Sequence, residues 1–172
     1  FLHEGNSLER RNAVRSHLKE NGYRIAQVTV DFEDWAWNTP YARCLDQNNK
    51  KSIQRLHKMY MDRAKWNFKH ITKISNILFE RPVKQILLLH IGGFTTETLD
   101  ELLTFYKSQG VRFIPLTEAM KDPIYAFNPN FASRGGSEFA YQVMRARGLK
   151  AKDLDPTPPI EFPGKILETI CQ

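Results

Sequence analysis

The sequence has only two cysteines among its 172 residues, and no apolar run approaches the roughly 20 residues that a transmembrane helix requires. Cys44 and Cys171 are too few and too far apart for a zinc motif or a disulfide framework. We therefore expect two unpaired thiols, and the alternative is one disulfide in an oxidising compartment. We also expect no transmembrane segment.

The composition is that of a chain with its own apolar core. Apolar residues make up 41% of the sequence and aromatic residues 12%, over about the length of one domain. The net charge is +6, and much of the excess lies in one stretch: Lys50, Lys51, Arg55, Lys58, Arg63, Lys65, Lys69 and Lys73. Such a stripe can bind an anionic partner, but it is more often the solvated face of a helix. We expect no nucleic-acid partner.

Apolar spacing and capping residues predict helices and strands in alternation. The expected helices cover residues 7–22, a segment opening at 38–40, 51–80, 95–110 and 137–147. The expected strands cover residues 25–30, 85–90 and 111–114. This order is typical of units in which helices pack outside a parallel sheet. The sequence therefore predicts an α/β fold.

Titratable residues follow the first two expected strands. The first strand runs into Asp31 and Asp34, and the second, QILLLH, ends in His90. Because the carboxyl ends of parallel strands share one edge, these groups are expected to meet there. A carboxylate bonded to an imidazole fixes its tautomer and favours its protonated form, which suits a general acid. The alternative is a histidine bonded to a backbone carbonyl, with Asp34 capping a turn.

The same segments resemble a known family. VTVDFEDW, ILLLH, the helix TTETLDELLTFYKSQG and the strand VRFIPLTEAM occur in the order found in polysaccharide deacetylases of the NodB-homology type, carbohydrate esterase family four. The resemblance covers about residues 1–125. It implies that residues 1–120 form the C-terminal portion of a distorted (β/α) barrel with seven or eight parallel strands. Residues 121–172 would be an irregular extension packed on the same domain.

The resemblance also implies an activity and roles for four residues. Members remove N-acetyl groups from amino sugars of a polysaccharide or peptidoglycan, commonly in the periplasm or outside the cell. By this resemblance, His90 is the general acid and Asp34 holds it in place. Trp35 lines the substrate groove, and Leu88 lines the pocket for the acetyl methyl group.

The sequence departs from the family pattern at the metal site. Members use an Asp of a paired-Asp motif and two His of an H-x-x-x-H motif to bind a divalent metal, commonly zinc. Neither motif occurs in this sequence, whose histidines are His3, His17, His57, His70 and His90. We therefore expect the metal ligands and the general base upstream of Phe1, which would itself end an R-x-P-aromatic motif. The chain alone would be inactive, and its open barrel would pair with that missing half or self-associate.

Two other functions remain open at this stage. The chain could be a non-catalytic module that binds a glycan or an anionic surface through the basic stretch and Trp35, Trp37 and Trp66. Less favoured is a glycoside hydrolase that uses the carboxylates of Asp31, Glu33 and Asp34, because paired glycosidase carboxylates usually come from different strands.

Overall fold

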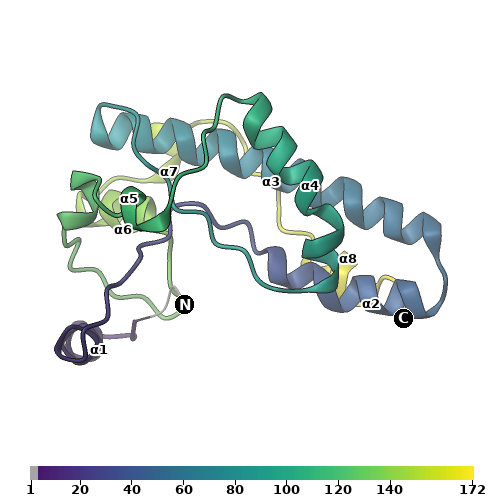
Figure 1. The fold of residues 1–172 in the computed structure, drawn as a ribbon, viewed down its shortest axis with the longest axis horizontal. Coiled ribbons are helices and arrows are strands. Elements are labelled where there is room, and N and C mark those ends of the chain that lie inside the picture. The colour runs from purple at the N-terminus through teal and green to yellow at the C-terminus, as the bar shows by residue number, and fades with distance from the viewer. Residues whose placement is uncertain (1–3) are drawn as a thin grey trace. The chain divides into compact units, whose positions relative to one another are not determined.

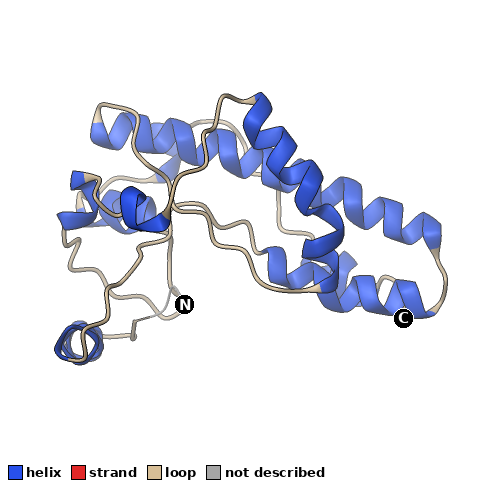
Figure 2. Ribbon diagram, in the orientation of Figure 1, coloured by secondary structure: helices blue, strands red, loops and turns tan. Residues whose placement is uncertain are grey.

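The computed structural model describes residues 4–172, and this part of the chain is a helical fold. It is about 58% helical with 1% strand, and Figure 2 shows helices and loops but no strand in it. Figure 1 labels the helices along the chain. They are α1 (Leu8–Glu20), η1 (Asp34–Trp37), α2 (Asn38–Asp46), α3 (Lys50–Phe79), α4 (Gly93–Ser108), α5 (Leu116–Ala119), η2 (Pro123–Ala126), α6 (Phe139–Ala146), α7 (Ala151–Leu154) and α8 (Gly164–Thr169).

The longer helices follow the predicted pattern closely. Helix α1 is capped by Ser7, whose Oγ accepts a hydrogen bond from Arg10 N at 3.2 Å, and it ends just before Gly22, whose φ is +76°. Helix α3 matches the predicted helix to within one residue at each end. Helix α4 begins two residues earlier than predicted. None of the helices in residues 4–172 has the length and apolar character that crossing a bilayer requires.

The expected barrel, or TIM-like, architecture is wrong for the described residues. The first two expected strands meet in a single parallel bridge, between Val30 and Leu87. The backbone N–H groups of Thr29 and Val30 both donate to the carbonyl of Ile86 at 3.0 Å. The hydroxyl of Thr29 accepts the N–H of Ile86 at 2.8 Å. Because a side chain takes the place of a backbone carbonyl there, the ladder does not continue.

One further backbone group of this region, the carbonyl of Val28, also pairs outside a sheet. The carbonyl of Val28 accepts a hydrogen bond from the N–H of Phe139 at 2.7 Å, where α6 begins. Residues 111–114, the third expected strand, have no regular secondary structure and form no bridge with any described residue. A helix terminus therefore occupies the edge that another strand would need.

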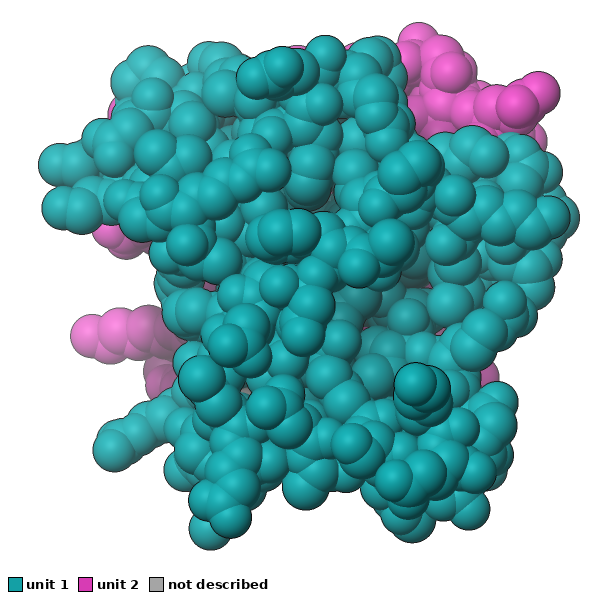
Figure 3. Space-filling view, turned by 90° about the vertical axis from the view of Figure 1, so that its left-hand side faces the viewer, with its two compact units in different colours: residues 1–30, 70–87, 114–157 teal, residues 31–69, 88–113, 158–172 magenta. Residues whose placement is uncertain are grey.

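The chain divides into two compact units, coloured separately in Figure 3. Unit 1 comprises residues 1–30, 70–87 and 114–157. Unit 2 comprises residues 31–69, 88–113 and 158–172. The division of the sequence at residue 120 stays a prediction.

Unit 1 combines an apolar core with a buried polar cluster. The core contains Val30, Ile71, Ile74, Leu78, Ala140 and Met144. Beside it, His70 Nδ1 lies 2.7 Å from Asp155 Oδ2, and His70 Nε2 lies 2.9 Å from the hydroxyl of Tyr141. Lys73 donates to the other oxygen of Asp155 at 2.8 Å. The bond from Lys73 contributes most to holding the pKa of Asp155 below its usual range. These contacts tie the end of α7 to α3.

A second buried carboxylate, Asp122, stabilises the loop before η2. It accepts hydrogen bonds from Arg81 at 2.5 and 3.2 Å, from Lys84 N at 3.0 Å and from Ile124 N at 3.2 Å. Burial opposes its ionisation, but these bonds outweigh burial and lower its pKa from 3.8 to about 2.

We expect Asp122→Asn to destabilise the fold by about 2 kcal/mol at neutral pH, which is what this lowering of the pKa corresponds to. Because the folded-state pKa is depressed, this stability is complete above the ordinary carboxyl pKa. It is lost as the pH falls from 3.8 through about 2. The free energies of unfolding of the wild type and the variant, measured by urea denaturation, should therefore converge at low pH. Glu118→Gln is the control, because its ion pair with Lys84 is exposed and contributes little.

Unit 2 is built around buried aromatic rings. Tyr60 of α3 makes edge-on contacts with Phe32, Trp37 and Phe94 at centroid distances of 5.1, 5.7 and 5.4 Å. All four side chains are buried. Burial also raises the pKa of Tyr60 to about 12. This cluster packs η1 and the start of α4 against α3.

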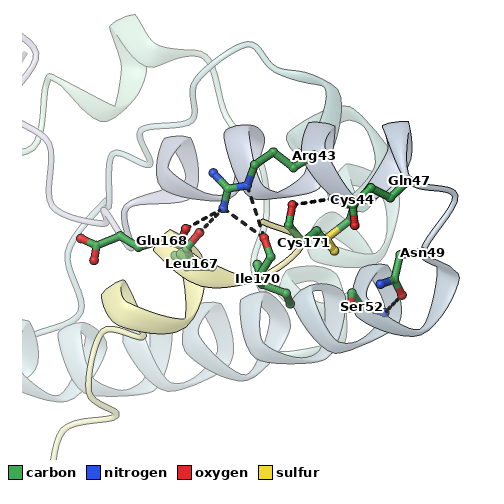
Figure 4. Close-up of a disulfide and its surroundings, with 9 residues drawn as sticks. All are labelled: Arg43, Cys44, Gln47, Asn49, Ser52, Leu167, Glu168, Ile170 and Cys171. Carbon is green, nitrogen blue, oxygen red and sulfur yellow. Dashed lines mark hydrogen bonds between the residues drawn. A yellow bond between two sulfur atoms is a disulfide. The ribbon is translucent and has the colours of Figure 1, made fainter.

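The two cysteines form a disulfide within unit 2, so the expectation of two unpaired thiols is wrong. Cys44 of α2 and Cys171 are bonded, with their Cα atoms 5.1 Å apart and 127 positions apart in sequence. Figure 4 shows the guanidinium of Arg43 donating hydrogen bonds to the backbone carbonyls of Leu167, Glu168 and Ile170 at the end of α8. The disulfide and Arg43 together fix the C-terminal segment to α2.

Candidate functional site

The structure brings His90 and Asp34 together within unit 2. His90 Nδ1 lies 2.8 Å from Asp34 Oδ1, and the backbone N–H of His90 donates to Asp34 Oδ2 at 2.7 Å. The Asp34 side chain is fully buried, whereas the His90 side chain is 41% exposed. Its Nε2 has no hydrogen-bond partner among the described residues. One carboxylate thus orients both the backbone and the ring of His90, and Nε2 stays available to a ligand.

The elements around Asp34 hold its carboxylate in place. Asp34 begins η1, directly after Glu33, whose backbone is left-handed with φ of +63°. Asp31 Oδ1 accepts the N–H of Glu33 at 2.8 Å and stabilises this turn. Thr95 of α4 is buried and donates its hydroxyl to Asp34 Oδ2 at 3.2 Å. Asp34 therefore accepts three hydrogen bonds.

Asn38 supports the loop that follows His90. Its side-chain oxygen accepts the N–H of Phe94 at 3.0 Å. The backbone of Gly92 lies so close to the Asn38 amide that a β-carbon there would overlap it. Gly93 is different, because a β-carbon there would make an ordinary 3.6 Å contact with Tyr41. Packing against Asn38 is thus sufficient reason for a glycine at position 92, without any substrate.

We expect Gly92→Ala to destabilise the fold by about 1–3 kcal/mol, because the new methyl group must displace the hydrogen-bonded Asn38 amide. Gly93→Ala is the matched control. It lies in the first turn of α4 with room for a β-carbon, so it should be neutral or slightly stabilising. If urea denaturation shows the same loss of unfolding free energy for Gly92→Ala and Gly93→Ala, then Asn38 does not stabilise this loop.

The acidic residues next to Asp34 are also engaged. The Glu33 carboxylate pairs with Arg63 of α3, whose Nε also donates to the carbonyl of Phe32 at 3.1 Å. Asn67 donates to the carbonyl of Asp31 at 2.9 Å. Burial raises the pKa of Asp31. Two of the three carboxylates proposed for a glycosidase are therefore already paired, with Arg63 and His90.

The aromatic and apolar candidates lie in different environments. The Trp35 side chain, next to Asp34 in sequence, is 57% exposed and open to a ligand. Leu88 is partly buried two positions before His90. Trp37 is fully buried in the aromatic core, and Trp66 is partly buried. Trp37 therefore cannot contribute to the suggested binding surface of three tryptophans.

The described residues do not fit a metal site. In residues 4–172, no three His, Cys, Asp or Glu side chains gather closely enough to hold an ion. Both oxygens of Asp34 are occupied by hydrogen bonds from His90 and Thr95. His3 and Phe1, which the sequence interpretation considered, lie outside the described residues.

The basic stretch of α3 is partly neutralised inside the molecule. Lys58 pairs with Asp62 at 2.6 Å, Arg63 pairs with Glu33, and Lys73 pairs with Asp155 at 2.8 Å. Lys65 lies 5.8 Å from the centre of the Phe105 ring. Half of the eight basic side chains therefore have internal partners, which weakens the prediction of an anion-binding stripe.

Comparison with protein-family models, curated proteins and solved structures found no match to the chain.

Sequence interpretation missed three residues that support the pair. From the sequence, Thr95 and Asn38 mark only the expected starts of two helices, and Arg63 belongs only to the basic stretch. Their contacts join positions 31 to 61 residues apart, and residue spacing alone does not indicate such pairs.

Proposed function

We propose that this chain supplies the general-acid half of a hydrolase site that removes N-acetyl groups from amino sugars of a polysaccharide or peptidoglycan. The observation that carries the proposal is the Asp34–His90 pair. A fully buried carboxylate holds a partly exposed imidazole through both its ring and its backbone. This arrangement suits proton donation to a leaving group at the protein surface.

In this proposal His90 acts through Nε2. As the bond between the acetyl carbon and the sugar nitrogen breaks, Nε2–H gives its proton to the departing amine. Asp34 keeps Nδ1 protonated, so that the imidazolium can donate from Nε2 and stay in one orientation. Thr95 acts as a positioning residue by holding the Asp34 oxygen that also accepts the His90 N–H.

The exposed Trp35 and the partly buried Leu88 are proposed substrate contacts. An exposed indole offers a flat apolar face, which can pack against the apolar face of a sugar ring. Leu88 would contact the acetyl methyl group. These two roles rest on the family resemblance and on the proximity in sequence of both residues to the pair.

The water-activating half of the reaction lies outside residues 4–172 in this proposal. A divalent metal such as zinc would activate the attacking water in the complete protein. Because the described residues offer no cluster of ligands for it, we assign it no residue here. The disulfide is compatible with the proposed periplasmic or secreted location, since disulfides persist in oxidising compartments.

The test uses the complete gene product that contains this chain, incubated with oligomers of N-acetylglucosamine. Release of acetate without new reducing ends is expected and supports deacetylation. New reducing ends would instead support a glycoside hydrolase. Retention on the glycan with neither product would favour the non-catalytic binding module.

A further inference from the structure

A small hollow in unit 1 is lined by charged and small residues that the proposed function does not use. Its lining includes Glu4, Gly5, Arg11, Ser133, Gly136 and Ser137. Arg11 belongs to α1 and is only 1% exposed, so its guanidinium is held away from bulk water. A buried cation is stable only when its charge is balanced nearby.

That balance is incomplete because two arginines share one carboxylate. Arg15 contacts the two oxygens of Glu4 through Nε and Nη2, each at 2.9 Å. Arg11 reaches Glu4 only through Nε, at a longer distance of 3.3 Å. Its Nη2 donates to the neutral amide of Asn128 at 2.8 Å. Among the described residues of this cluster, one positive charge is therefore left without a counter-charge.

Other groups make the surroundings still more favourable to an anion. Burial, and then the charge of Arg15, lower the pKa of Arg11. The Nε of Arg11 is buried and makes no hydrogen bond with the described residues. A further guanidinium, that of Arg145, lies 5.5 Å from the centre of the Phe131 ring, which also lines the hollow. The hydroxyls of Ser133 and Ser137 add hydrogen-bond donors to the lining.

We propose that this hollow binds a small inorganic anion of chloride size. The hollow is partly open and has room for about one water-sized sphere, so a single small ion fits it better than a larger oxyanion. The ion would supply the missing negative charge to Arg11 and accept hydrogen bonds from its Nε–H and from the serine hydroxyls. Binding would stabilise the junction between the start of α1 and the loop 131–137.

The test measures the melting temperature of the chain in sodium chloride and in sodium gluconate at equal ionic strength, because gluconate is too large for the hollow. Chloride at about ten times its dissociation constant is expected to raise the melting temperature by roughly 3 °C over gluconate. Broadening of the chloride NMR line by the wild-type protein provides a direct second readout.

Two variants should change this effect in opposite directions. Arg15→Gln leaves Glu4 free to neutralise Arg11, so the chloride effect should shrink at least several-fold. Glu4→Gln removes the shared carboxylate, so chloride should bind more tightly than in the wild type. Arg10→Gln is the control, because Arg10 is exposed on the same helix and does not line the hollow.

Equal melting temperatures in chloride and gluconate, without line broadening, would mean that the hollow holds only water and would overturn the proposal. Changes of the same sign in Arg15→Gln and Glu4→Gln would also overturn it, since charge balance would then not control binding. These outcomes are independent of acetate release, so the proposed function can fail while the anion site stands.

Discussion

His90→Asn is expected to lower the rate of acetate release by the complete gene product by about 100-fold to 10,000-fold, the usual contribution of a general acid. Asparagine can still accept or donate a hydrogen bond, but it cannot deliver a proton to the departing amine. The loss should therefore fall on kcat more than on KM, because the Asp34 carboxylate and the exposed Trp35 surface remain. Initial rates at saturating and limiting substrate separate the two parameters.

His57→Asn is the matched control for this experiment. His57 Nε2 of α3 lies 3.0 Å from Glu101 Oε2 in a partly exposed position outside the proposed site, so its variant should keep near-normal rates. Asp34→Asn should also reduce kcat, because an amide that donates to Nδ1 leaves the ring neutral with its proton on Nε2. The double variant Asp34→Asn with His90→Asn should have a kcat only slightly below that of His90→Asn alone. Near-normal kcat for His90→Asn would show that His90 is not the general acid.

Helices were predictable from the sequence because their signals are local. The apolar stripe of α3 repeats every three or four residues, and Gly22 and Gly110 adopt the left-handed backbone that ends α1 and α4. Strands depend on distant partners, and an apolar run does not reveal them. In QILLLH only Ile86 is buried, and its N–H is taken by the hydroxyl of Thr29. A hydroxyl that competes with the backbone leaves no signal in apolar spacing.

The candidate site shows the same limit. The pairing of Asp34 with His90 was anticipated from their places at the ends of two extended segments, and these segments do meet, in one bridge rather than in a sheet. The residues that hold this pair in place were not predicted from the sequence. Asn38 and Thr95 become part of the site only because η1, α2 and α4 pack together, and this packing depends on the buried ring of Phe94. Local sequence thus indicates the reactive groups better than it indicates the groups that hold them.

Replacing both cysteines, Cys44→Ser with Cys171→Ser, is expected to destabilise the chain by about 2–5 kcal/mol. The disulfide joins positions 127 apart, and closing so long a loop removes much of the conformational entropy of the unfolded chain. The fully buried Cys44 side chain adds packing that serine, with its hydroxyl, does not reproduce. Urea denaturation of the oxidised wild type and the double variant measures the difference.

Reduced wild-type protein should unfold at a lower urea concentration than oxidised wild type, because it loses the cross-link. It should unfold at a slightly higher urea concentration than the double variant, because it keeps the packing of the buried Cys44 side chain. Arg43 and Gln47 still bond the carbonyls of α8 and Cys171, so the C-terminal segment should stay docked in the folded state of either form (Figure 4). Adding Arg43→Ala to the double variant should therefore release this segment and cost further stability, as protease sensitivity after residue 158 would reveal. Oxidised wild type that is no more stable than reduced protein would contradict the role of the cross-link.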